Sequence, residues 1–166
     1  MFHMNRIFRH SHLTPYEADY AQWCAEQGAL LREGRLSDLD RENLAEEIES
    51  LGRSDKREIE SRLKVLLVHL LKLQFQAKQV KEGWRSTVVE QRRRIRKLIK
   101  ESPSLRSYPM QVLAEEYEYA RSDAAGETGL PARVFPENCP YDIDDILDLD
   151  FYPQAVGSAG GQSDLA

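Results

Sequence analysis

A long stretch of helical periodicity without a proline constrains the fold of this chain more than any other feature. It starts near Asp38 or Asp40 and continues to about Lys78. Apolar residues recur in it at steps of three and four, which is typical of a helix that buries one face. These residues are Leu44, Ile48, Leu51, Ile59, Leu63, Leu66, Leu70 and Leu73.

Gly52 is the one weak point in this pattern. Glycine inside a helix costs about 1 kcal/mol relative to alanine. An unbroken helix of this length would also extend about 60 Å at 1.5 Å per residue, which is long for a chain of 166 residues. The sequence therefore leaves open whether one helix passes through Gly52 or a break or kink lies near residues 52–54.

A shorter helix is predicted before this stretch. Thr14 would be its N-cap, Glu17 would close a capping box, and Gly34 would end it. Trp23 has the size and position of a core anchor. Cys24, next to it, is expected to be a small core residue, because no base that could activate its thiol is specified.

Two more helices and an irregular segment follow. One helix begins after Gly83 and stops at residues 102–103, and the other covers about residues 109–125. Residues 130–153 contain four prolines and only a short helical turn at 142–147. We expect this segment to lie as a strap over the helices, because its apolar residues need burial: Val134, Phe135, Tyr141, Ile146, Leu147, Phe151 and Tyr152.

Together these elements predict an all-α protein. The expected fold is a helical bundle of about four main helices with an irregular C-terminal strap, because no segment of useful length alternates with the period of a strand. We expect a disordered lead over residues 1–13, one domain over residues 14–153 and a disordered tail over residues 154–166.

Polar residues interrupt the apolar stripe of the long helix. Asp55, Arg62 and His69 are seven residues apart and stack on one side, with Glu47 and Glu58 along its flank. We call these five residues the polar ladder. An unpaired buried charge costs several kcal/mol, so partners are expected from the later helices: Arg85, Gln91, Glu116 and Tyr117.

The polar ladder has two interpretations. It could fix helix register, as buried polar residues do in some bundles. It could instead line a cleft in which Glu47, Asp55, Glu58 and His69 act as acid–base groups or metal ligands, with Arg62, Arg85 and Gln91 contacting an anion. Residue 66 is leucine, so the Glu-x-x-His motif of di-iron bundles is absent. No metal site and no cofactor are predicted.

A basic strip follows in the third helix. It consists of Arg92, Arg93, Arg94, Arg96, Lys97 and Lys100. Such a strip could contact a phosphate backbone. However, no aromatic side chains alternate with these residues to stack on bases, and the chain carries a net charge of -5. The aspartate-rich segment at residues 142–150 could meet the strip within one molecule or across a dimer.

Several protein classes are excluded. No apolar run reaches the length of about 18 residues that a transmembrane helix needs, and the N-terminal residues lack the apolar core of a secretory signal. The two cysteines, Cys24 and Cys139, form no zinc-binding pattern. A cytoplasmic protein that does not act at a membrane is the expected class.

The order of several segments resembles a known family. The segments are "YEADYAQWCAEQGALLREGRLSDLDRENLAEEIESLGRSDKREIESRLKVLLVHLLK", "GWRSTVVEQRRRIRKLI", "SPSLR" and "FPENCPYDIDDILDLDFYP". Over about Tyr16 to Pro153 the chain is similar to the domain of unknown function 29 family. The resemblance implies a small all-helical bacterial protein. It implies no reaction, ligand or catalytic residue.

Three functions are compatible with these patterns. The leading hypothesis is a non-enzymatic helical module that recognises a protein partner or a second copy through its charged faces. The second is a metal-dependent or acid–base hydrolase that uses the polar ladder. The third is nucleic-acid binding through the basic strip.

Overall fold

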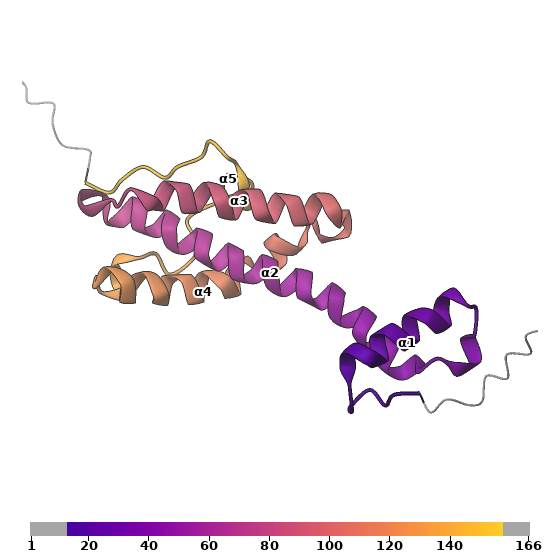
Figure 1. Cartoon of the computed structure of the whole chain (residues 1–166). Helices are drawn as coiled ribbons and strands as arrows, with labels where there is room; N and C mark the ends of the chain where they lie inside the picture. Colours follow the sequence, from indigo (N-terminus) through magenta and orange to yellow (C-terminus); the bar gives the residue numbers. More distant parts are fainter. Residues whose placement is uncertain (1–12, 158–166) are drawn as a thin grey trace, which may run out of the picture. The chain divides into compact units, whose positions relative to one another are not determined.

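The structure is a computed structural model that describes residues 13–157. Within that range it contains no strand, which confirms the predicted all-α fold (Figure 1). The α-helices are α1 (Tyr20–Arg32), α2 (Arg41–Phe75), α3 (Gly83–Glu101), α4 (Tyr108–Thr128) and α5 (Ile143–Leu147). Short 3₁₀ turns separate them: η1 (Leu36–Asp38), η2 (Ala77–Gln79), η3 (Pro103–Leu105) and η4 (Ala132–Val134).

The contacts divide the chain into two compact units. Unit 1 ends at Gly52, and unit 2 starts at Arg53. The single domain predicted over residues 14–153 stays a prediction, and the two units are described separately below. Of the predicted lead and tail, residue 13 and residues 154–157 are described, and the Val156 N–H donates to the Gln74 carbonyl at 2.8 Å; the rest lies outside the described residues.

The helix α2 continues from Arg41 to Phe75 without the break that the sequence left open at Gly52. The stripe prediction holds for its later part, where Ile59, Leu63 and Leu66 are fully buried. It is wrong for Ile48 and Leu51, whose side chains are 66% and 70% exposed. Helical period identifies an apolar face, but it does not show whether another element covers that face.

The start of α1 in unit 1 differs from the prediction. Asp19, not Thr14, is the N-cap, and its side chain accepts a hydrogen bond from the Gln22 N–H at 3.0 Å. Thr14 instead donates from its backbone N–H and its hydroxyl to the Glu26 carboxylate, at 2.7 and 2.9 Å. Gly34 follows the helix with φ 70°, the left-handed conformation that favours glycine.

The core of unit 1 is small and centres on Trp23, which is 1% exposed. Its indole N–H donates to the Asp40 carboxylate at 3.1 Å, and the buried Gln27 side chain accepts from the Asp40 N–H at 2.8 Å. The core role predicted for Cys24 is wrong, because its side chain is exposed. Consecutive residues of a helix point about 100° apart, so burial of Trp23 turns Cys24 away.

In unit 2, the helices α3 and α4 lie alongside the later part of α2 (Figure 1). Trp84 and Val88 of α3 and Tyr117 and Ala120 of α4 are buried against its leucines. Among residues 13–157, no helix combines the length and the apolar composition needed to cross a membrane.

The C-terminal segment closes the core of unit 2 as the predicted strap. Phe135, Tyr141 and Ile146 are buried, and Leu147, Phe151 and Tyr152 pack against them at the edge. Hydrogen bonds fix its course: the Tyr117 hydroxyl donates to the Pro136 carbonyl at 2.7 Å, and the Tyr141 hydroxyl donates to the Gln74 side chain at 2.6 Å. Val134 is the exception to the predicted burial, with 39% of its side chain exposed.

Candidate functional site

The residues of the polar ladder lie in different environments in the structure. Glu47 belongs to unit 1, where it accepts hydrogen bonds from the hydroxyls of Tyr16 at 2.5 Å and Tyr20 at 2.8 Å. These bonds lower the pKa of Glu47, raise that of Tyr16 to about 12 and raise that of Tyr20. The carboxylate is therefore held charged by two phenols that pack around Trp23.

In unit 2, Glu58 and Arg62, four residues apart on α2, form an ion pair. Arg62 donates through Nε at 2.8 Å and through Nη2 at 2.7 Å to one Glu58 oxygen. Its Nη1 donates to the Gln91 side chain of α3 at 3.2 Å. Gln91 is thus the expected partner that the structure does bring to the ladder. Of the other expected partners, Arg85 stacks on Tyr152 and Tyr117 bonds to the strap.

Asp55 and His69 do not join this pair. Asp55 is half-buried, and no other described side chain forms a hydrogen bond or an ion pair with it. His69 is also half-buried, and its Nδ1 lies 2.9 Å from the Val65 carbonyl, so that nitrogen carries the proton and donates. Burial lowers the pKa of His69. Over residues 13–157, no three His, Cys, Asp or Glu side chains are grouped so that they could hold a metal ion.

Arg92 has to be removed from the predicted basic strip. Its side chain is fully buried, with Nε donating to the Ile146 carbonyl at 2.7 Å and Nη2 reaching the Asp145 carbonyl at 3.5 Å. The ring of Tyr152 lies 5.4 Å from its guanidinium carbon and 4.5 Å from that of Arg85. Burial lowers the pKa of Arg92, and its Nη1 has no hydrogen-bond partner among the described residues.

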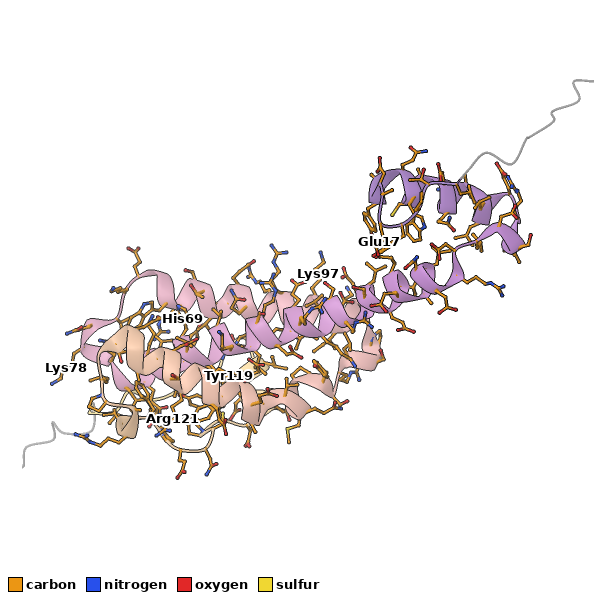
Figure 2. All side chains as sticks on the ribbon, turned by 90° about the horizontal axis from the view of Figure 1, so that it is seen from below. Glu17, His69, Lys78, Lys97, Tyr119 and Arg121 are labelled. Atoms are coloured by element: carbon orange, nitrogen blue, oxygen red, sulfur yellow. The ribbon has the colours of Figure 1, made fainter. Side chains whose placement is uncertain are left out.

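The other five residues of the strip are exposed on α3, and one of them, Lys97, is labelled in Figure 2. Two of them are paired along the helix, Arg94 with Glu90 at 2.8 Å and Lys97 with Glu101 at 3.7 Å. Arg93, Arg96 and Lys100 form no ion pair with any described residue. Their spacing of three and four places them on one side of the helix. We call these three residues the basic row.

An acidic segment lies beside α3, in and around α5. Its five aspartates are all exposed: Asp142, Asp144, Asp145, Asp148 and Asp150. Asp148 and Asp150 are close enough to Arg92 to favour its charged form. Even so, no ion pair between the acidic segment and the basic row occurs in the described part of the chain. Two surfaces of opposite sign, carried by the contacting elements α3 and α5, are therefore not neutralised by each other on unit 2.

A shallow groove of about 530 Å³ lies between α2 and α3. It is lined by Gln91 of α3 and by residues from three turns of α2: Ser54, Arg57, Glu58, Ser61, Arg62 and Val65. Arg57 is exposed and forms no ion pair within residues 13–157. Glu58, Arg62 and Gln91 were among the predicted site residues, whereas Ser54, Arg57 and Ser61 were not. The spacing of Ser54 and Ser61, four and three residues from Glu58, was the available signal, and Arg57 has no such spacing to a ladder residue.

A family model described as domain of unknown function DUF29 matches residues 15–152. The chain belongs to this family. Searches of the curated proteins and of the solved structures gave no match for this DUF29 chain. The match confirms the resemblance over almost the whole described chain. The family description assigns no activity, so the function has to be argued from the surfaces of the molecule.

Proposed function

We propose that this DUF29 chain is a non-enzymatic interaction module that pairs with a second copy of itself through unit 2. The basic row of each copy would contact the acidic segment of the other. One observation carries the proposal: two exposed surfaces of opposite charge, on the contacting elements α3 and α5, do not neutralise each other within the described residues. A cytoplasmic location, as expected from the cysteines, is part of this proposal.

Neighbouring patches of opposite sign are self-complementary under a two-fold rotation. Such a rotation brings the basic row of each copy onto the acidic segment of the other. The two contacts then close a dimer and leave no free surface for a third copy. Each exposed ion pair contributes about 0–1 kcal/mol, so both sets of contacts are needed. We therefore expect a concentration-dependent dimer rather than a permanent one.

Nucleic acid fits this surface less well. Glu90 and Glu101 stand among the exposed cations of α3 and are paired with two of them, so a phosphate backbone would meet negative charge as well. The net charge of -5 opposes the approach of a polyanion to the molecule. Nor does the geometry favour the acid–base alternative, because Glu47, Glu58 and His69 are each bonded to different partners.

Sedimentation equilibrium of the full chain at increasing salt tests the proposal. The Debye length falls from about 10 Å at 0.1 M salt to about 3 Å at 1 M, so we expect dimers at low salt and monomers at high salt. Reversing the basic row (R93E, R96E, K100E) should give monomers at all salt concentrations. Reversing three other exposed cations (K81E, R106E, R133E) makes the same charge change and should leave the dimer intact.

Mixing provides the sharper experiment. A second variant with D144K, D145K and D148K should also be monomeric, but an equimolar mixture of the two reversed variants should dimerise, because every contact is again between opposite charges. A wild-type chain that stays monomeric at high concentration and low salt would overturn the proposal. A salt-dependent shift of RNA or DNA, lost on reversal of the basic row, would support nucleic-acid binding instead.

A further inference from the structure

The groove between α2 and α3 is a second site, separate from the charged surfaces used for pairing. We infer that it binds the phosphate monoester group of a small organic molecule. The inference goes beyond the proposed function and does not depend on it. It is carried by the set of hydrogen-bond donors that the groove collects within unit 2.

Most polar groups of the groove are donors. Arg57 and Arg62 contribute two guanidinium groups, Ser54 and Ser61 two hydroxyls, and Gln91 its side-chain N–H₂. Glu58 is the only carboxylate in the lining, so the charged lining sums to one positive charge. A phosphoryl group offers three acceptor oxygens and matches the fork of an arginine in two parallel hydrogen bonds.

Arg62 is held in place before any ligand arrives. Glu58 fixes one edge of its guanidinium through two contacts, and Gln91 fixes Nη1 from the other helix. The side chain is only 25% exposed, against 41% for Glu58. Little side-chain entropy remains for a ligand to remove, which favours binding. Arg57, five residues earlier and without an ion-pair partner among the described residues, is the cation free to close on the anion.

The groove has room for more than a bare phosphate ion. A volume of about 530 Å³ lies in the range of about 300–1,000 Å³ that is typical of small-molecule sites. Val65 provides an apolar contact in the lining. The phosphoryl group would therefore bind at the arginines and serines, and the organic part of the ester would lie along the rest of the groove.

Binding in the groove and pairing through the basic row are independent. Gln91 and Lys100 are nine residues apart on α3, which is two and a half turns, so they point to opposite sides of the helix. A ligand in the groove would leave the basic row uncovered.

Amide NMR titration of the full chain, with calorimetry, tests this inference. Phosphoserine should give saturable shifts at Ser54, Arg57, Ser61 and the Gln91 side chain, and inorganic phosphate should bind the same residues more weakly. Serine and glutamate should give none. The chain with a reversed basic row should bind phosphoserine as the wild type does.

The exposed Arg57 provides the discriminating variant. R57Q removes a charge-assisted contact and should weaken phosphoserine binding at least about tenfold. S61A should weaken it less, and R133Q, an exposed arginine outside the groove, should have no effect. Shifts that do not saturate, equal binding of glutamate, shifts mapped to the basic row, or an R57Q variant that binds like wild type would overturn the assignment.

Discussion

At the scale of single residues, the most unusual group is the buried arginine of α3. Arg92 has no carboxylate partner within the described chain, and two backbone carbonyls and an aromatic ring replace it. The cost of burying a charge and the gain from these contacts oppose each other. The hydrogen bonds decide the balance, because removing the guanidinium leaves the Ile146 carbonyl unpaired, whereas the Asp145 carbonyl still accepts from the Asp148 N–H at 3.2 Å.

Arg92→Met is therefore expected to lower the free energy of unfolding by about 1–3 kcal/mol, the usual cost of leaving buried polar groups without partners. Urea denaturation followed by circular dichroism measures it. Arg133→Met, at an exposed arginine outside the basic row and the groove, is the control and should change stability by less than about 0.5 kcal/mol. Unchanged or increased stability of Arg92→Met would show that the charge costs more than its contacts contribute.

His69 is expected to make stability depend on pH. Burial lowers its pKa in the folded state below the ordinary value of 6.5, so the unfolded chain takes up the proton first. The stability that depends on neutral His69 is fully present above about pH 6.5, the ordinary pKa of this residue in the unfolded chain. It is lost as the pH falls toward the lower pKa of the folded state. Urea denaturation at several pH values between about 5 and 8 should show a smaller slope for His69→Gln than for wild type. Equal slopes would contradict this.

At the scale of elements, sequence patterns predicted the helices better than their ends and exposed faces. α3 begins at the predicted glycine, Gly83, and the short turn expected at residues 142–147 is α5. Thr14 was wrongly predicted as the N-cap because the sequence fits a capping box. The same sequence pattern is present although the Thr14 hydroxyl donates to Glu26. The burial of Ile48 and Leu51 was wrongly predicted because exposure depends on tertiary contacts.

Gly52 lies inside α2 with nothing within 4 Å of the position of a Cβ atom. Gly52→Ala should therefore raise the free energy of unfolding by about 0.5–1 kcal/mol through helix propensity alone. Gly129→Ala is the opposite case, because Gly129 ends α4 with φ 70°, and it should lower stability by a similar amount. Thermal and urea unfolding followed at 222 nm measure both. A destabilising Gly52→Ala would mean that glycine is required there.

At the scale of the whole molecule, charge is arranged more specifically than the composition suggests. The basic strip looked uniform in sequence, yet Arg92 lies in the core because it continues the buried row of Trp84 and Val88 at steps of four. That spacing could be recognised in the sequence alone. The grouping of Arg57 with Gln91 was not, because it depends on how α2 and α3 pack. The fold was thus predictable from periodicity, and the groove was only partly so.

The contacts of Arg92 also affect how the gene can change. The groups that contact the guanidinium of Arg92 come from residues 145, 146 and 152, more than fifty positions later in the sequence. A premature stop codon before residue 143 would leave a guanidinium facing an open apolar surface. The codons for residues 143–152 are therefore needed to complete the core around Arg92.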